Sequence, residues 1–309
     1  MRALLVVVAA CSAPAAAPQA PRVVEPTGPE LVTSAPGAMS FAIDGSDIYW
    51  LAPGSGVWEL AGGSATKLAE VGSDAHELAV GSAAVYWAHD DVVMRVAKGG
   101  GAADQETDTH SRSGLEDSME VMPPVRTIAV RGSQVDVIEG YGPDGMAWSR
   151  WIGHPDGSKT HKLRGEDPVI AIGSDTVIGT STELEQHELG AEGGWLRTPV
   201  DGGVRALAVD GDDIFFGNTS IFEKFGQGPV NKLGPAGGPV TAMAVDPSYI
   251  YWAIGAGDRD PAIYRAKRAK PELELFTRVG SASQLVVAGE FLYWLDPAEG
   301  AIHRIKRQK

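Results

Sequence analysis

A short phrase recurs along the chain and constrains its fold more than any other feature of the sequence. The phrase is a small-aliphatic pair, a turn, and an aliphatic residue followed by two aromatic residues. Five copies keep the first aromatic residue seven positions after the start of the phrase; they begin at Ala42, Ala79, Ala208, Ala244 and Val286. Two weaker copies, at Ala129 and Ala171, lack the aromatic residues. Successive copies start 37, 50, 42, 37, 36 and 42 residues apart.

A repeat of about 40 residues built from short strands is typical of a β-propeller, in which each repeat forms one four-stranded sheet. A third strand follows the aromatic residues in most units, as in 57–60, 263–266 and 302–305, and a fourth comes next. Helical periodicity is absent. The sequence therefore predicts an all-β fold, a seven-bladed β-propeller over residues 29–309. Six or eight blades stay open as alternatives, because the third and fourth units have lost part of the phrase.

The two ends of the predicted propeller indicate how its ring closes. The seventh unit supplies only three strands before Lys309, and a strand-like segment at 29–32 precedes the first unit. We expect this N-terminal strand to become the outermost strand of the last blade. Main-chain hydrogen bonds would then lock the ring and remove an open sheet edge.

Three of the aromatic strands carry a family resemblance. The segments Val85-Tyr86-Trp87, Ile250-Tyr251-Trp252 and Leu292-Tyr293-Trp294-Leu295-Asp296 resemble the YWTD repeats of lipoprotein-receptor propellers and the related TolB-like repeats of bacterial surface proteins. The threonine of the signature is absent from every copy, and its aspartate survives only as Asp296. The resemblance implies the propeller fold and a habit of binding other molecules. It implies no catalytic residue.

The first eleven residues have the pattern of an export signal. Arg2 precedes an apolar run from Ala3 to Ala10, which is too short to span a bilayer. The segment Val8-Ala9-Ala10-Cys11 resembles the bacterial lipobox, and that family implies cleavage before Cys11 and lipidation of its thiol. Residues 1–10 are therefore predicted to be a lipoprotein signal peptide. An ordinary secretory signal, cut near residues 15–17, is the alternative.

A segment rich in proline and alanine, residues 11–28, follows the signal. Its prolines lock φ and remove hydrogen-bond donors, and it has little apolar surface to bury. It is predicted to be a tether. Because Ser12, and not aspartate, follows Cys11, the sorting rule of the lipoprotein family favours the outer membrane, on its periplasmic or cell-surface side.

Charge and cysteine content exclude several classes of function. The chain has 40 acidic and 26 basic side chains and a formal net charge of -14, which argues against nucleic acid as a partner. Its one cysteine cannot form an internal disulfide or a cysteine-rich zinc site. No nucleophile elbow, phosphate loop or dinucleotide fingerprint is present in the sequence.

Ligands of propellers bind at the channel mouth, which is formed by the loops that enter the first strands and the loops that join second to third strands. Polar residues are most frequent in these loops of the second unit, where Asp74 precedes the first strand together with two of the candidates. The candidate ligand-binding residues are His76, Glu77, His89, Asp90, Asp91, Arg126 and Arg205. Four of them could hold a divalent cation, the one cofactor that the residues allow: His76, Glu77, His89 and Asp91. Solvated turn residues are the more common explanation of such a group. The Asp-Gly and Asp-Pro turns are assigned to structure, since they lack the spacing of a calcium loop.

These observations favour a binding module over an enzyme. We expect an exported, lipid-anchored propeller that binds or scaffolds a protein, a peptide or an envelope polysaccharide. The alternative is a metal-dependent hydrolase or lyase of the lactonase kind, with a cation at the channel mouth. The insertion at residues 98–119 is expected to be a surface loop, or a docking arm over the second unit.

Overall fold

The computed structural model describes residues 28–90, 92–106, 125–131, 134–139, 147–152, 160–163, 169–172, 175–188, 196–255, 260–268 and 270–307. The predicted signal peptide, Cys11 and the tether up to residue 27 lie outside this part of the chain, as do Asp91 and residues 107–119 of the insertion. Within it, every regular element is a β-strand, so the all-β prediction is confirmed. Among the described residues, no helix could cross a membrane.

The described strands form seven four-stranded antiparallel sheets. In chain order, the first sheet consists of β2 (Ser40–Asp44), β3 (Asp47–Ala52), β4 (Gly56–Ala61) and β5 (Ser64–Ala69). The second consists of β6 (Ala75–Val80), β7 (Ala84–His89), β8 (Val92–Ala97) and β9 (Asp104–Gln105). The third consists of β10 (Val125–Arg131), β11 (Gln134–Glu139), β12 (Ala147–Ile152) and β13 (Thr160–Leu163).

The fourth sheet consists of β14 (Val169–Ile172), β15 (Asp175–Gly179), β16 (Glu183–Glu188) and β17 (Leu196–Pro199). The fifth consists of β18 (Ala206–Asp210), β19 (Asp213–Gly217), β20 (Ser220–Phe225) and β21 (Val230–Pro235). The sixth is β22 (Val240–Val245) to β25 (Lys270–Arg278), with β23 (Tyr249–Ile254) and β24 (Ala262–Lys267). The seventh combines β26 (Gln284–Ala288), β27 (Phe291–Asp296) and β28 (Ala301–Lys306) with β1 (Glu30–Ser34) from the start of the described chain.

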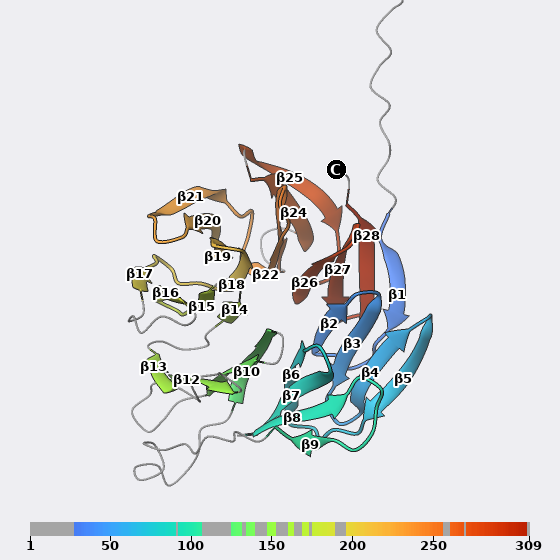
Figure 1. Ribbon diagram of the computed structural model, residues 1–309. Helices are drawn as coiled ribbons and strands as arrows, with labels where there is room; N and C mark the ends of the chain where they lie inside the picture. The colour runs from blue at the N-terminus through green and yellow to red at the C-terminus, as the bar shows by residue number, and fades with distance from the viewer. Residues whose placement is uncertain are drawn as a thin grey trace, which may run out of the picture.

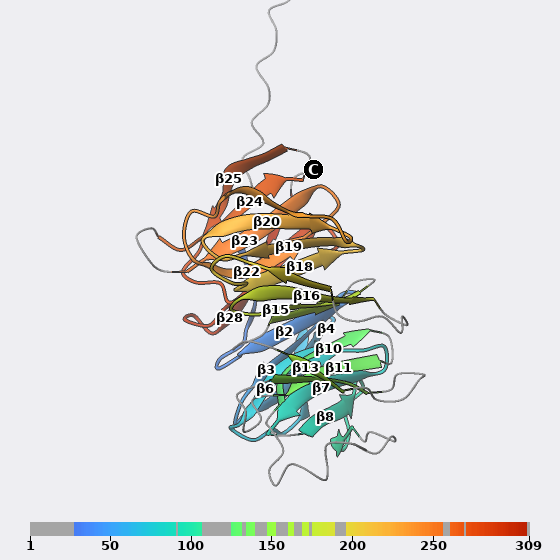
Figure 2. The same ribbon diagram turned by 90° about the vertical axis from the view of Figure 1, so that its left-hand side faces the viewer.

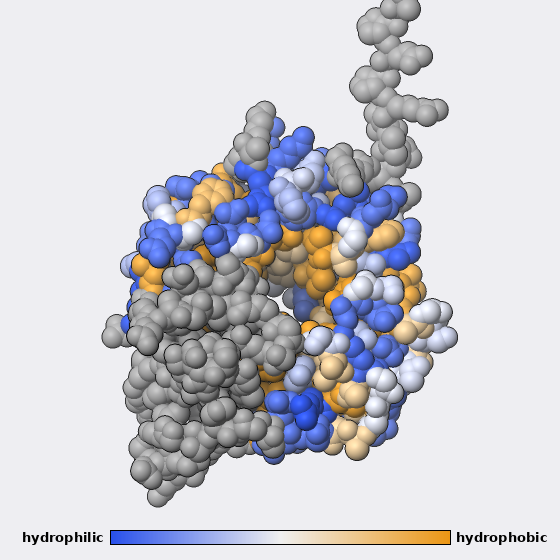
Figure 3. All heavy atoms as spheres, in the orientation of Figure 1, coloured by the Kyte–Doolittle hydropathy of each residue, from blue (hydrophilic) through white to orange (hydrophobic). Residues whose placement is uncertain are grey.

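The sheets are arranged around a central axis as in a β-propeller (Figures 1 and 2). The first strand of each sheet lies beside the first strand of the next, in the order β2, β6, β10, β14, β18, β22 and β26, and β26 lies beside β2 again. The space-filling view shows an opening at the centre, with apolar residues on part of its wall (Figure 3). Gly45, Gly211 and Gly289 lie in the turns between first and second strands and have a positive φ of 55–61°, a conformation that glycine adopts without strain.

The closing strand lies where the sequence predicts it. β1 pairs antiparallel with β28, and the order of the seventh sheet is β1-β28-β27-β26. Glu30 lies opposite Arg304, and the Arg304 Nε atom donates to the Glu30 carboxylate at 3.0 Å. The second sheet has the same kind of pair between its third and fourth strands, with Arg95 and Asp104 at 3.0 Å. The N-terminal strand therefore takes the place of a fourth strand.

The aromatic pairs on the second strands form the core between neighbouring sheets. Tyr251, from the sixth sheet, packs in one buried cluster with Trp294 of the seventh. Trp252 faces the other way and packs with Phe215 of the fifth sheet. All four side chains are at most 2 % exposed. The tyrosine of one sheet thus meets the tryptophan of the next, which confirms that these aromatic residues belong to the core.

The two degenerate units keep most of the core positions with aliphatic side chains, although Asp136 stands opposite Ala129 where other units have the first aromatic residue. Val135 and Val137 of β11 are buried against Tyr86 of the second sheet, and Val177 of β15 is buried against the fifth. In the fourth sheet Ala171 pairs with Val177, six residues on, whereas Ala42 pairs with Tyr49, seven residues on. The weak copy at Ala171 therefore has a turn that is one residue shorter.

Candidate functional site

The channel-mouth face is defined here as the end of the ring that holds the turns after the second strands and the loops that enter the first strands. Three predicted candidates of the second sheet lie near the start of β6 or the end of β7. His76 Nδ1 donates to the Asp74 carbonyl oxygen at 2.9 Å. Glu77 is a β-bulge residue between His76 and Leu78 and has a positive φ of 50°. His89 is the last residue of β7.

The structure brings together a group that includes only one of the four predicted metal ligands. His89 Nδ1 lies 3.1 Å from Asp74 Oδ1, and Asp90, with a φ of 53°, supplies a third ligand atom. The candidate ligand atoms of Asp74, His89 and Asp90 all lie within 4.8 Å of one another. His76 and Glu77 are not in this group, and Asp91 lies outside the described residues. Asp74 was not among the predicted metal ligands.

A glycine makes room for this group. A Cβ atom at Gly72 would lie 2.6 Å from Asp74 Oδ1 and 3.2 Å from His89 Cε1. A side chain at this position would push the two residues apart. Gly72 therefore allows the close approach of Asp74 and His89.

The two predicted arginines lie on other sheets. Arg126 is a bulge position of β10, between Val125 and Thr127. Arg205 precedes β18, has an exposed side chain, and donates its backbone N–H to the Gly217 carbonyl at 2.9 Å. The candidates therefore come from the second, third and fifth sheets. They are not one local cluster along a single sheet.

A comparison of the sheets explains the position of His89. It stands two residues after Trp87. Among the residues whose side chains the structure describes, three other sheets have a polar residue at the same place, just beyond or at the end of the second strand: Thr180, Asn218 and Asp296. In each of those sheets this residue caps the turn that leads to the third strand. We call it the turn-cap position.

Asp296 is the most complete of the turn caps. Its carboxylate accepts backbone N–H groups from Ala298 at 3.0 Å and Glu299 at 3.1 Å, and it also accepts from the backbone and hydroxyl of Ser281. Burial acts to raise the pKa of Asp296, but these hydrogen bonds outweigh it and hold the pKa below its usual range. Asp296 therefore ties the turn to the loop that enters β26.

Asn218 and Thr180 do the same with uncharged groups. Asn218 Oδ1 accepts the backbone N–H of Ser220 at 2.9 Å, and its Nδ2 donates to the carbonyl oxygens of Asp201 and Gly203 at 2.9 Å. Thr180 Oγ1 accepts the backbone N–H of Glu183 at 3.1 Å. By analogy, the contact between His89 and Asp74 joins the turn of the second sheet to the loop that enters β6.

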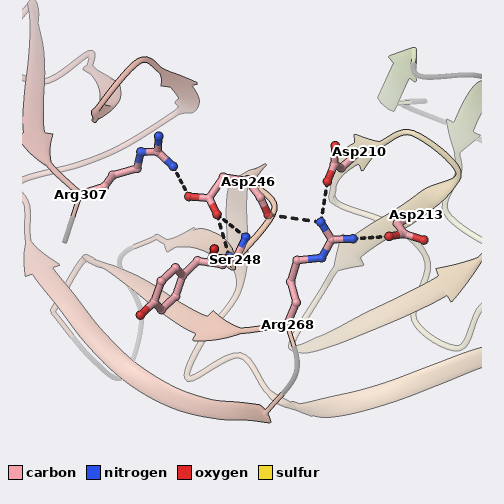
Figure 4. Close-up of polar contacts among 7 residues, drawn as sticks. Asp210, Asp213, Asp246, Ser248, Arg268 and Arg307 are labelled. Atoms are coloured by element: carbon pink, nitrogen blue, oxygen red, sulfur yellow. Dashed lines mark hydrogen bonds and ion pairs between the residues drawn. The ribbon is translucent and has the colours of Figure 1, made fainter. Parts of the chain in front are cut away.

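The opposite end of the ring, which we call the hairpin face, holds the turns between first and second strands and the ends of the third strands. Here Arg307, which follows β28, donates to the carboxylate of Asp246 from the neighbouring sixth sheet (Figure 4). Asp246 also accepts the backbone N–H groups of Ser248 at 2.6 Å and Tyr249 at 2.8 Å. The Tyr251 hydroxyl donates to it at 3.1 Å, and burial, followed by the charge of Asp246, raises the pKa of that hydroxyl.

Two more contacts of this kind join neighbouring sheets. Arg268, which follows β24, donates to Asp210 and Asp213 of the fifth sheet and to the Asp246 carbonyl at 3.3 Å (Figure 4). Lys98, which follows β8, donates to Asp44 of the first sheet. In all three, an aspartate at the third position of the phrase binds the basic residue just after the third strand of the next sheet. We call these contacts inter-sheet clamps.

The clamps correspond to a sequence pattern that is visible only when neighbouring units are compared. Where a unit has no aspartate at the third position of its phrase, the next unit has no basic residue after its third strand. Four pairs of neighbouring units lack a clamp. In each pair below, the first residue is at the third position of the phrase and the second follows the third strand of the next unit: Gly81 with Gly153, Arg131 with Leu189, Gly173 with Gly226, and Ala288 with Gly62. The clamps confirm that the Asp-Gly and Asp-Pro turns at Asp44, Asp210 and Asp246 are structural.

Comparisons with known proteins agree with the fold. No protein-family model matches the chain, and no curated protein matches it. A chain of the mitotic checkpoint complex is 12 % identical with a TM-score of 0.67, over 98 % of this chain and 100 % of that one. The β-propeller domain of the trilobed protease from Pyrococcus furiosus, described as having an open velcro topology, is 8 % identical with a TM-score of 0.59, over 88 % of this chain and 94 % of that one.

A third similar structure is the extracellular domain of a one component system from B. thetaiotaomicron. It is 12 % identical with a TM-score of 0.63, over 90 % of this chain but only 39 % of that one. At such low identity the similarity shows the fold alone. The chain has an all-β, propeller-like fold built from repeated four-stranded sheets.

Proposed function

We propose that this protein is an exported, lipid-anchored, seven-bladed propeller that acts as a binding or scaffold module for a protein, a peptide or an envelope polysaccharide. The observation that carries the proposal is that polar side chains at both ends of the ring stabilise its turns and sheet boundaries. Asp296, Asn218 and Thr180 cap turns at the channel-mouth face, and Arg268 and Arg307 join sheets at the hairpin face. A rigid ring that presents loops is typical of binding scaffolds.

The similar structures support a binding role. One is the extracellular domain of a one component system, and another belongs to a protein complex. The seven four-stranded sheets support the proposed blade count. The role itself is inferred from architecture, because propellers serve many functions.

The sequence supports the lipid anchor and the domain boundaries. We propose a signal peptide at 1–10, a tether at 11–28 and the propeller at 29–309, with lipidation of Cys11 at the outer membrane. β1 begins at Glu30 and pairs with β28, which supports the proposed boundary at residue 29.

A crosslinked pull-down from the cell envelope tests the binding role. The wild-type protein and Arg205→Glu, which reverses an exposed charge at the channel mouth, are compared with Lys232→Glu on an outer strand. A partner that is captured reproducibly by the wild type and Lys232→Glu, and lost with Arg205→Glu, supports a channel-mouth binding module. Equal recovery of the same background proteins by all three would contradict it.

The group formed by Asp74, His89 and Asp90 favours a second candidate, the metal-dependent hydrolase or lyase. One imidazole and two carboxylates are suitable ligands for a divalent cation, which could polarise an ester carbonyl. Calorimetric titration of the protein with Zn²⁺ or Mn²⁺ tests this candidate. A second group of possible ligands is formed by Asp296, Glu299 and His303, so His303→Gln distinguishes the two groups. Stoichiometric binding that disappears in His89→Gln and persists in His303→Gln would support the candidate; absence of binding would leave the turn-cap role of His89 as the explanation.

A further inference from the structure

A basic motif occurs twice, at the ends of the third strands of the sixth and seventh sheets. Its pattern is Arg-x-Lys-Arg-x-Lys, at residues 265–270 and 304–309. Residues 264–309 contain nine basic and five acidic side chains, a net charge of +4 in a chain whose total is -14. The other 263 residues therefore carry a net charge of -18. Positive charge is concentrated in this segment, which starts in the third strand of the sixth sheet and excludes Asp246 and Asp260 of that sheet.

The arginines of both motifs have partners within the ring. The first arginine of each motif binds an acid on the adjacent outer strand: Arg265 binds Glu274 at 2.9 Å, and Arg304 binds Glu30 at 3.0 Å. The second arginine of each, Arg268 or Arg307, forms an inter-sheet clamp. The planar guanidinium group suits these fixed contacts with carboxylates.

The lysines between these arginines stay at the surface. Lys267 is exposed, and its charge adds to that of Arg265 in lowering the pKa of Glu274. Lys306 is 55 % exposed and lies 3.1 Å from Glu290, which is itself 62 % exposed. Such an exposed pair contributes little to stability and exchanges readily for another anion. Each motif therefore uses arginine inside the structure and leaves lysine for solvent or a ligand. We call the rim around Lys267 and Lys306 the basic edge.

The chain also enters the ring at the basic edge. β1 starts with Glu30 opposite Arg304, so the first residue of the closing strand lies two positions from Lys306 along β28. A proline-rich segment extends by about 3.1 Å per residue, so residues 12–28 could reach roughly 50 Å. A tether of this reach does not by itself fix how the ring faces a membrane.

We propose that the basic edge rests on the anionic head groups of the membrane to which the lipidated Cys11 holds the protein. This inference rests on the proposed lipid anchor. Ammonium groups near an anionic surface are attracted to it, and the attraction falls off over a Debye length of about 8 Å at physiological salt. Of the acidic side chains near the edge, Glu274, Glu30 and Asp246 are paired with arginines, and Glu290 forms the exposed pair with Lys306. The channel-mouth face would then be free for a partner.

Flotation of the full chain with lipid vesicles tests the basic edge without the anchor. Every protein carries Cys11→Ser, so no acyl chain contributes and residues 1–10 contribute equally. The test variant is Lys267→Gln with Lys306→Gln. The matched control is Lys67→Gln with Lys232→Gln, which removes two lysines from outer strands of the first and fifth sheets, one of them also paired with a glutamate.

We expect the parent protein to bind phosphatidylglycerol-containing vesicles more strongly than pure phosphatidylcholine vesicles, and high salt to remove the difference. The test variant should lose at least about fivefold in partitioning, and the control should change by less than about twofold. Equal partitioning of both double variants, or no preference of the parent for anionic vesicles, would overturn the proposal. Failure here leaves lipidation of Cys11 untouched, because that is measured separately by labelling.

Discussion

The Arg307 guanidinium donates to the Asp246 carboxylate across the boundary between the sixth and seventh sheets. Asp246 is 8 % exposed, and its second role is to accept two backbone N–H groups of its own turn. One side chain therefore fixes a hairpin and a sheet boundary together. Arg268 continues the network to the fifth sheet through the Asp246 carbonyl, so three sheets are joined on the hairpin face.

Breaking this clamp should destabilise the ring. Arg307→Ala leaves the buried Asp246 charge without its cation, so we expect a loss of about 3 kcal/mol in the free energy of unfolding. Asp246→Ala should cost a similar amount. Urea denaturation of the two single variants and the double variant gives the coupling energy, which should be about 1–3 kcal/mol. Additive single effects would show that the contact does not stabilise the boundary.

The turn cap at Asp296 predicts a dependence of stability on pH. The pKa of Asp296 is lowered in the folded protein. Its contribution to the free energy of unfolding is therefore complete above the pKa of the unfolded chain, about 3.9, and is lost as the pH falls through the pKa of the folded protein. Asp296→Asn should lower the free energy of unfolding by about 1–3 kcal/mol at pH 7. The difference between wild type and variant should shrink at about pH 3. A difference that is the same at both pH values would contradict a charged cap.

The ion pair at the closing strand should matter much less than the strand itself. Arg304 and Glu30 are 36 % and 48 % exposed, and exposed pairs contribute about 0.5 kcal/mol. Glu30→Ala should therefore shift the urea midpoint only slightly, because the backbone pairing of β1 with β28 is unchanged. A loss above about 2 kcal/mol would show that the side chains, and not the main chain, close the ring.

The inter-sheet core predicts a large effect of one tryptophan. Trp294 is 2 % exposed and packs between the sixth and seventh sheets, so Trp294→Ala should cost about 3–5 kcal/mol. Phe291→Ala, in the same strand but only partly buried, is the matched control and should cost less. Thermal unfolding of both variants checks the order. Equal losses of stability in the two variants would contradict the assignment of Trp294 to the core between the sixth and seventh sheets.

Much of the fold follows from spacing alone. The seven-residue distance from Ala42 to Tyr49 is the cross-strand register of the first hairpin, and the same register holds for Ala244 and Tyr251. The closing strand at Glu30 follows from counting strands in the last unit. The shorter turn of the fourth sheet could not be predicted, because Val177 and Ile178 lack the aromatic residues that mark the register.

The contacts of the candidate residues could not be predicted from the sequence, for a physical reason. His89 stands at the turn-cap position, which other sheets fill with aspartate, asparagine or threonine. Because these residue types differ, the sequence does not reveal the shared position, and the histidine was interpreted as a metal ligand from its type alone. Its closest ionisable contact is Asp74, which lies 15 residues earlier in another loop. The clamps were missed because their members lie more than 50 residues apart, as with Asp210 and Arg268. Only a comparison of adjacent units shows that the two residue types occur together.

The most direct test of the proposed anchored scaffold is metabolic labelling with radioactive palmitate in a Gram-negative host. The wild-type protein and Cys11→Ser are compared, with membrane and soluble fractions collected from each. We predict that the wild type is labelled and sediments with the outer membrane, whereas Cys11→Ser is unlabelled and is not retained there as a lipoprotein. An unlabelled wild-type protein, or identical labelling and fractionation of the two, would contradict the proposal.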